Sequence, residues 1–262
     1  MSNGAAGSLP QNRLPDAASV LIEMTLVPRS GAVAHGAAPA PAGAPTYRIL
    51  RTLEVDEYED PVPPAEVLAL ASARPPPTDN VFRGTARRAA KLSIADANME
   101  AFEDLNALIG TLQDHATMVA HPGISTKATN NRVAEEKRNV RVKAFLYAAS
   151  REDDNDFHLI IGRDPAKPAK YMTVEISGLP PSNSVHFAAL KEARDAYFEF
   201  FGDRLPGAPY DFYDPPIPVD IEGSLFFDAS HAQGGRPGPA KLRPKMPVVW
   251  EVHPVARIVF EP

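Results

Sequence analysis

Five segments in the second half of the chain alternate apolar with polar residues, and one helical segment lies between the third and the fourth. Apolar residues at every second position indicate a strand with one buried face, whereas apolar residues three and four apart indicate a helix. In order, the segments are strands at 140–149, 156–162 and 170–177, a helix at 189–202, and strands at 219–229 and 248–261. Three strands, a helix and two further strands in this order favour a small closed barrel, which we expect to occupy residues 137–262.

Alternation also divides each predicted strand into an apolar row and a second row that carries histidines and carboxylates. We expect the apolar rows to fill the interior of the barrel, burying Phe157, Leu159, Val174, Ile176 and Trp250. The polar residues of the second rows, together with those at the end of the fourth strand, are His158, Glu175, Asp228, His231, Glu251 and His253.

These six polar residues are the candidate catalytic residues. Their types bind metals through nitrogen and oxygen atoms and also exchange protons as acid–base pairs. They converge only if the second rows lie close together, and sequence does not determine the stagger of a barrel. The alternative is that each one holds a loop in place through hydrogen bonds, because a buried polar group needs a partner.

The first half of the chain is expected to be less regular. The chain has 28 prolines, about twice the usual share of about 5%, so much of its length is predicted to be loop. We divide this half into a disordered tail at 1–18 and a segment at 19–136. That segment contains strands at 19–27 and 46–55 that could pair, a low-complexity linker at 31–45, and helices at 63–73, 85–92 and 94–113. The cluster of Arg87, Arg88 and Lys91 is interpreted as a solvated helix face, with phosphate contact as the alternative.

The order of elements in residues 137–262 resembles the OB-fold, a partly open five-stranded barrel that binds oligonucleotides and oligosaccharides. Four short patterns are also similar to those of uncharacterised bacterial proteins: DFHL at 156–159, VEI at 174–176, GSLFFDASH at 223–231 and WEVHPV at 250–255. The resemblance implies an α+β chain, with a five-stranded OB-like antiparallel β-barrel and one helix after a Pro/Ala-rich, partly helical N-terminal region. A fold of this kind does not name the ligand.

The loop between the last two predicted strands, at 231–245, favours an anionic partner. It is rich in glycine and carries the cations Arg236, Lys241, Arg243 and Lys245. Aromatic rings near cations can stack on bases while the cations follow the phosphate backbone, so Tyr147 and Tyr171 are predicted to contribute to binding. The alternatives are a solvated loop and rings that pack in the core.

Composition excludes or disfavours several kinds of site and several classes of protein. The absence of cysteine excludes disulfides, thiolate metal sites and cysteine nucleophiles. A net charge of −6, with most of the acidic excess in residues 1–136, weighs against a strong positive field for nucleic acid but allows a local basic groove. No segment reaches the roughly 18 consecutive apolar residues of a membrane helix, and the N-terminus lacks a signal-peptide pattern. A cytoplasmic protein without membrane contact is therefore expected.

The leading interpretation is a non-enzymatic OB-like binding module for an anionic partner, most plausibly single-stranded nucleic acid. It requires no cofactor. One alternative is a metal-dependent hydrolase acting on a phosphodiester, in which the histidines and carboxylates above would bind a divalent metal. The other is a structural or assembly protein that acts through contacts with another protein.

Overall fold

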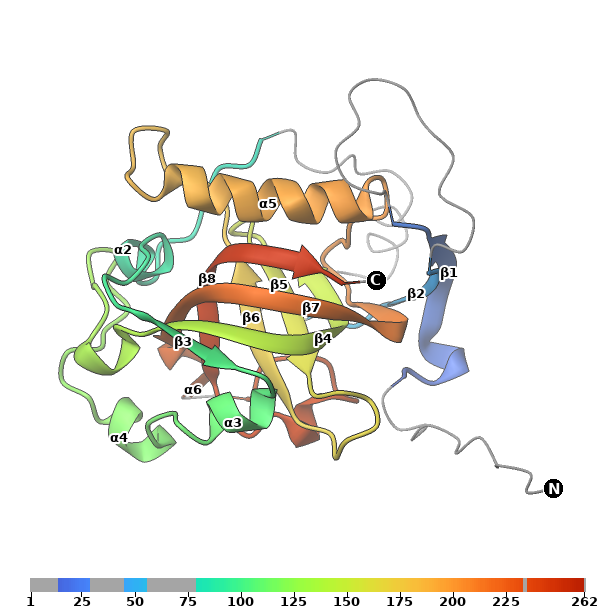
Figure 1. The fold of residues 1–262 in the computed structure, drawn as a ribbon, viewed down its shortest axis with the longest axis horizontal. Coiled ribbons are helices and arrows are strands. Elements are labelled where there is room, and N and C mark those ends of the chain that lie inside the picture. Colours follow the sequence, from blue (N-terminus) through green and yellow to red (C-terminus); the bar gives the residue numbers. More distant parts are fainter. Residues whose placement is uncertain (1–13, 29–44, 56–78, 233–234, 262) are drawn as a thin grey trace.

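The computed structural model describes residues 14–28, 45–55, 79–232 and 235–261 (Figure 1). The strands are β1 (Val20–Leu26), β2 (Tyr47–Thr52), β3 (Met99–Phe102), β4 (Asn139–Arg151), β5 (Phe157–Gly162), β6 (Tyr171–Ile176), β7 (Asp211–Phe227) and β8 (Trp250–Phe260). The helices are α2 (Arg88–Lys91), α3 (Leu105–Ile109), α4 (His115–Val119), α5 (Phe187–Phe201) and α6 (Ala229–Ala232). Three-residue 3-10 turns are η2 (Ala17–Ser19), η3 (Ala134–Glu136) and η4 (Arg243–Lys245).

The eight strands form one mixed sheet in the order β1-β2-β7-β8-β6-β5-β4-β3. An additional β7–β4 pairing joins β4, β5, β6, β8 and β7 into a ring, and the pairs β3–β4 and β6–β8 are parallel. The prediction of a five-stranded OB-like antiparallel barrel is therefore wrong. The reason lies in the long strands: β7 begins at Asp211 rather than at 219, and its first residues pair with β2, while the start of β4 pairs with β3.

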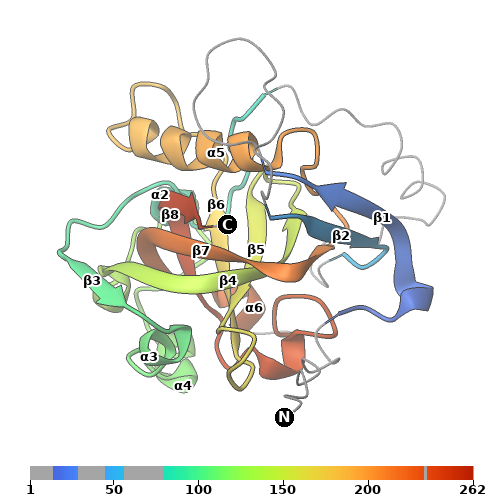
Figure 2. The ribbon, with the colours of Figure 1, turned by 45° about the vertical axis from the view of Figure 1, so that its right-hand side comes forward.

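The predicted strand pair near the N-terminus is confirmed, because β1 and β2 pair antiparallel. The pair extends the sheet beside β7, as Figure 2 shows. A side-chain ion pair fixes this junction: the Arg51 guanidinium donates two hydrogen bonds of 2.7 Å to the buried Asp211 carboxylate.

The predicted helix at 94–113 is wrong, because this segment contains β3 and the short helix α3. The Asn139 side chain donates hydrogen bonds to the carbonyl oxygens of Ala95 and Ala97, at 2.8 and 2.9 Å. Those carbonyls are then not used within a helix, and the chain continues extended alongside β4. Asp104 starts α3 afterwards by accepting a hydrogen bond from the Asn106 amide.

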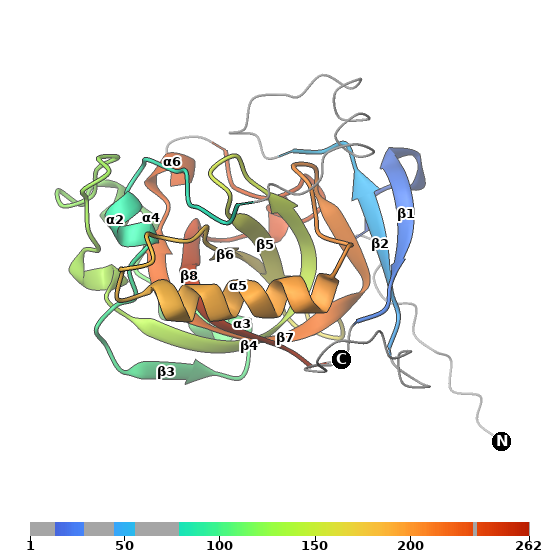
Figure 3. The same cartoon turned by 90° about the horizontal axis from the view of Figure 1, so that it is seen from above.

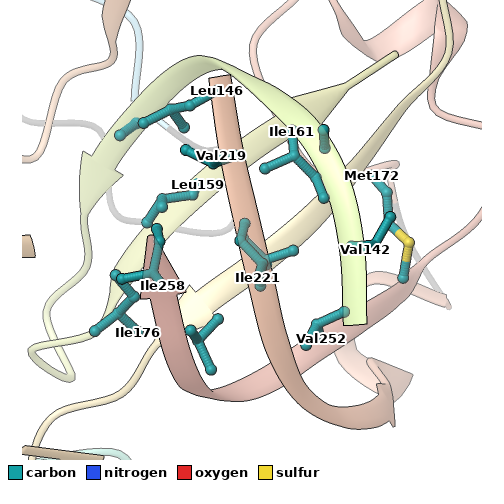
Figure 4. Packing of buried hydrophobic residues seen from close by; sticks show 14 of the residues in the cluster. Val142, Leu146, Leu159, Ile161, Met172, Ile176, Val219, Ile221, Val252 and Ile258 are labelled. Atoms are coloured by element: carbon teal, nitrogen blue, oxygen red, sulfur yellow. The ribbon is translucent and has the colours of Figure 1, made fainter. Parts of the chain in front are cut away.

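The main hydrophobic core lies inside the ring of five strands (Figure 4). Val252 belongs to it, as do all five apolar residues that were predicted to be buried: Phe157, Leu159, Val174, Ile176 and Trp250. This part of the prediction is confirmed. Helix α5 lies across the strands and contacts β8 and β6 (Figures 1 and 3), adding its aromatic residues to the same core.

Some predictions fall on parts of the chain that lie outside the described residues. These are most of the tail at 1–18, most of the linker at 31–45 and the helix at 63–73. Among the helices that the structure describes, none combines the length and the apolar character needed to cross a membrane.

Candidate metal centre

Strands β5, β6 and β8 carry the centre of the candidate site on the face that points away from the apolar core. His158 of β5 is the register partner of Glu175 on β6. The parallel register aligns Val174 of β6 with Val252 of β8. The next residues along these two strands, Glu175 and His253, are therefore also neighbours. A row of histidine, glutamate and histidine thus crosses the three strands.

The two imidazoles of this row face different oxygens of Glu175. Nδ1 of His158 lies 3.4 Å from Oε1 of Glu175 and 2.8 Å from Oε1 of Glu152. Nδ1 of His253 lies 2.6 Å from Oε2 of Glu175. The other ring nitrogen of His253, Nε2, lies 3.3 Å from Oδ2 of Asp156. Glu175 is therefore the centre of the cluster.

Three further candidates extend the cluster. Oε2 of Glu251 lies 3.6 Å from Nδ1 of His253, and ligand atoms of Asp228, His231 and Glu251 lie within 4.8 Å of one another. Asp228 accepts hydrogen bonds from the Ser230 and His231 amides and contacts Nδ1 of His231. The structure thus brings all six sequence-predicted candidates into one cluster, while their catalytic role stays a prediction.

Many polar atoms of this cluster are buried but make no hydrogen bond of normal geometry. They are both ring nitrogens of His158 and of His253, both carboxylate oxygens of Glu251, Oε2 of Glu175 and Oδ2 of Asp156. The five side chains belong to residues that are at most 2% exposed. Unsatisfied polar atoms at such depth are rare and costly. Donor atoms that lie close together without hydrogen bonds between them have lone pairs left to bind a cation.

The pKa values show that the cluster is short of positive charge. Burial first, and then the charge of Glu175, raises the pKa of Glu251 to about 8. Burial and a neighbouring carboxylate raise the pKa of Asp156 to about 7. Burial alone would lower the pKa values of His158 and His253, but the surrounding carboxylates raise both well above the usual value. Protons or other cations are therefore bound strongly here.

A pocket of about 220 Å³ opens onto the cluster. The cluster side chains that line it are Glu152, Glu175, Asp228 and His231. Lys91 of α2 also lines it, with Nζ 3.4 Å from Oδ2 of Asp154 and 3.8 Å from Oε2 of Glu175. Burial would lower the pKa of Lys91, but Glu175 and the nearby aspartates raise it well above the usual value. The pocket therefore contains a cation beside the carboxylates.

Two buried arginines fix α2 beside the cluster. Arg87, next to the start of α2, donates hydrogen bonds of 2.6 and 2.7 Å to the two carboxylate oxygens of Glu136. Arg132 donates to the carbonyl oxygen of Ala90 at 2.7 Å and to that of His253 at 2.6 Å. The interpretation of the basic cluster as a solvated helix face is wrong for Arg87, because pairing with Glu136 holds it in the interior.

The donor atoms fit a divalent cation. Two groups of three side chains share Glu175, namely Glu152 with His158 and Asp156 with His253, and the ligand atoms in each group lie within 4.8 Å of one another. Atoms that bind one zinc ion lie at most about 4.2 Å apart, twice a bond of about 2.1 Å, so only small movements are needed. Imidazole nitrogens and carboxylate oxygens suit zinc, manganese and iron.

The structure places the predicted stacking rings inside the protein. Tyr147 and Tyr171 are 5% and 3% exposed. They pack edge to face with ring centroids 4.9 Å apart, and the Tyr147 hydroxyl donates to the carbonyl oxygen of Arg163. Neither ring presents a face on which a base could stack without rearrangement.

The predicted cations of the loop at 231–245 contact their own chain. Arg236 donates to the Met246 carbonyl at 3.1 Å, and Arg243 donates to the Gly238 carbonyl at 2.9 Å. Lys241 pairs with Asp16 at 3.0 Å, while Lys245 is exposed. In the described part of the loop, none of these four cations lines the pocket.

Three residues of the site were not among the sequence candidates: Glu152, Asp154 and Asp156. The acidic segment 152–156 is the turn that joins β4 to β5. Its position directly before the strand that carries His158 is the signal that could have identified it. Alternation placed Asp156 on the same face as His158. Lys91 was named only within a basic cluster for which phosphate contact was the alternative, and its place beside the carboxylates depends on the fold that brings α2 to the cluster.

Comparison with known proteins gives no relative for this chain. No family model, no curated protein and no solved structure matches it.

Proposed function

We propose that this chain is a divalent-metal-dependent hydrolase that cleaves phosphodiesters. One observation supports it above all: buried imidazole and carboxylate atoms that lack hydrogen bonds converge beside a pocket. A structural metal site is closed by protein ligands, whereas a catalytic site keeps a position open for water or substrate. The pocket beside Glu152 and Glu175 supplies such an open position.

The proposed chemistry is attack by water. A bound divalent cation would polarise a phosphoryl oxygen and lower the pKa of a bound water. The water oxygen would attack phosphorus, and one water proton would pass to a pocket carboxylate outside the ligand groups, such as Asp154. The bond between phosphorus and the leaving oxygen breaks, and that oxygen takes a proton from His231, whose Nδ1 is held by Asp228. The products are a phosphate monoester and an alcohol.

Lys91 suits an anionic substrate. Its ammonium group lies on the pocket wall and stays protonated because carboxylates surround it. In the hydrolase it would neutralise a non-bridging phosphate oxygen. Arg87 also lines the pocket, but its two terminal nitrogens are engaged by Glu136. We therefore expect Lys91→Gln to raise KM by about 10-fold, the loss of one charged hydrogen bond.

The test starts from chelator-treated protein. Hydrolysis of bis(4-nitrophenyl) phosphate is measured with no metal and with Mn²⁺, Zn²⁺ or Mg²⁺ added. We expect turnover only with metal, and a loss of at least about 100-fold in His158→Ala and His253→Ala, because removing a metal ligand costs at least as much as removing its outer-shell partner.

Glu100→Gln is the matched control. Glu100 lies on β3, which pairs with the start of β4, and its side chain forms an ion pair with Arg138. It belongs to none of the three groups of ligand atoms. It should retain turnover. Metal binding without turnover on any phosphodiester would rule out the hydrolase activity, and the chain would then be a metal-binding protein. A folded chain that binds no metal would rule out both the hydrolase activity and the metal centre.

Single-stranded nucleic acid stays a predicted partner, but as a substrate of the hydrolase and not as the ligand of a binding module. For a binding module, the sequence predicted contacts through rings and a basic loop; for the hydrolase, an oligonucleotide would be one possible phosphodiester substrate. The buried rings and the self-contacts of the loop give less support to the binding module.

A further inference from the structure

We infer that the cluster holds two divalent cations and that Glu175 bridges them. This inference rests on the proposed metal centre and deepens it, because a pair of cations implies a particular way of binding phosphate. In two-metal hydrolases the ions lie about 3.5–4 Å apart and stabilise the attacking and leaving oxygens together.

The row across β5, β6 and β8 supports this pairing. Neighbouring strands lie about 4.8 Å apart, so His158 and His253 approach Glu175 from opposite sides. His158 faces Oε1 and His253 faces Oε2, at 3.4 and 2.6 Å. A carboxylate with one imidazole at each oxygen can give one oxygen to each of two cations. A single cation at one of these positions would leave the other imidazole paired with carboxylates alone.

Each position has a further carboxylate. Beside His158, Oε1 of Glu152 lies 2.8 Å from the same ring nitrogen that faces Glu175. Beside His253, Oε2 of Glu251 lies 3.6 Å from the ring nitrogen that faces Glu175. Asp156 also offers a ligand atom near His253, but it faces the opposite ring nitrogen at 3.3 Å, and from there it would orient the metal-bound imidazole rather than bind the same cation. Asp156 is itself fixed by the Gly178 amide at 2.6 Å.

The balance of charge also favours two cations. Six carboxylates gather at this place, those of Glu152, Asp154, Asp156, Glu175, Asp228 and Glu251. Once cations displace the protons that the metal-free cluster holds, the six ionised carboxylates, the neutral histidines, Lys91 and one divalent cation leave three net negative charges, whereas a second divalent cation leaves one. A buried excess of like charge is costly, so the second cation stabilises the arrangement.

The first measurement is stoichiometry. Chelator-treated protein is titrated with Mn²⁺, and bound metal per chain is determined by elemental analysis after desalting and by calorimetry. We expect two ions per chain and the electron paramagnetic resonance spectrum of an exchange-coupled Mn²⁺ pair. One ion per chain, or two ions without coupling, would overturn the bridged pair while leaving the proposed hydrolase intact. No bound ion would overturn both.

Single substitutions then separate the two positions. His158→Ala and His253→Ala should each retain one ion and lose the coupled spectrum. Glu175→Gln should lose the coupling, because an amide nitrogen cannot bind a metal as the second carboxylate oxygen does. Glu100→Gln should bind two ions like the wild type. Retention of the coupled pair in Glu175→Gln, with a circular dichroism spectrum like that of the wild type, would remove Glu175 as the bridge. If Glu175→Gln does not fold, the His158→Ala and His253→Ala stoichiometries decide the matter.

Discussion

Single residues at this site do not follow the rule that buried polar atoms are satisfied. His158, His253 and Glu251 are fully buried and make no hydrogen bond of normal geometry. Removing such groups from water without compensation costs stability. Residues that lower stability in this way are concentrated at functional sites. The neighbouring apolar residues Leu159, Val174 and Val252 instead pack inside the ring. The two faces of the same strands therefore serve stability and chemistry separately.

Trp250 tests the apolar side of this division. It is 2% exposed, packs against Phe227 with ring centroids 5.5 Å apart, and donates from Nε1 to the Gln113 carbonyl at 2.9 Å. Trp250→Ala should lower the free energy of unfolding by about 3–5 kcal/mol through the cavity it leaves. Trp250→Phe, which loses the hydrogen bond but retains a ring, should cost less. Urea unfolding measures both, and an alanine variant of unchanged stability would contradict the packing.

Asp104 gives a prediction for pH. The Arg163 guanidinium, opposed by burial and assisted by Lys167, lowers the pKa of Asp104 well below its usual range. A lowered folded-state pKa contributes stability above the unfolded pKa of about 3.9, and this contribution is lost as pH falls toward the folded value.

Asp104→Asn removes the charge but retains a side chain that can cap α3. It should cost about 1 kcal/mol at pH 7, because the ion pairs are only partly buried. The difference from the wild type should shrink as pH falls below about 4. Urea unfolding at pH 7 and at pH 3 measures it, and a difference that is independent of pH would mean that the charge has no role.

At the scale of elements, α2 is too short to hold its position without side-chain anchors. Arg132 ties it to the ring by donating to carbonyl oxygens of Ala90, Ser93, Leu225 and His253. Lysine has three rotatable donors and no planar fork, so it cannot satisfy these acceptors together.

Arg132→Lys should therefore lower the free energy of unfolding by about 2–4 kcal/mol, because buried carbonyl oxygens lose their donors. It should also raise KM for a phosphodiester, since Lys91 is carried by the same helix. Arg138→Lys is a control for the substitution, because Arg138 is a partly exposed arginine that pairs with Glu100. Equal effects of the two substitutions would show that α2 is held by other contacts.

The positions of the helices and strands were predicted from the sequence better than the pairing of the strands in the sheet. The strands at 156–162 and 170–177 and the helix at 189–202 were predicted within a few residues, because alternation and helical spacing are local signals. The early part of β7 and all of β3 were missed, since pairing over long distances decided their extended form. The faces of β5, β6 and β8 were predicted correctly, but their adjacency in the order β5-β6-β8 depends on a crossover through α5 that spacing does not specify.

At the scale of the whole molecule, the site combines segments that are far apart in the sequence. Lys91 comes from α2, Glu152 from the turn after β4, and Glu251 from the last strand. The cluster therefore forms only when the ring is closed and α2 has docked. A ligand that binds several of these segments must couple to the stability of the entire fold, because the unfolded chain offers no preformed site.

Chelation tests that coupling. A cation that binds only the native chain raises the free energy of unfolding by about 2.7 kcal/mol when its free concentration is 100 times Kd. Each kcal/mol corresponds to roughly 2–4 °C in Tm for a domain of about this size. Adding Mn²⁺ or Zn²⁺ to chelator-treated protein should therefore raise Tm by several degrees, in proportion to the logarithm of metal concentration. The double variant His158→Ala, His253→Ala should show no such rise, whereas Glu100→Gln should follow the wild type. A rise of equal size in the double variant would mean that the cations bind elsewhere, and the histidine and glutamate row would then have no part in it.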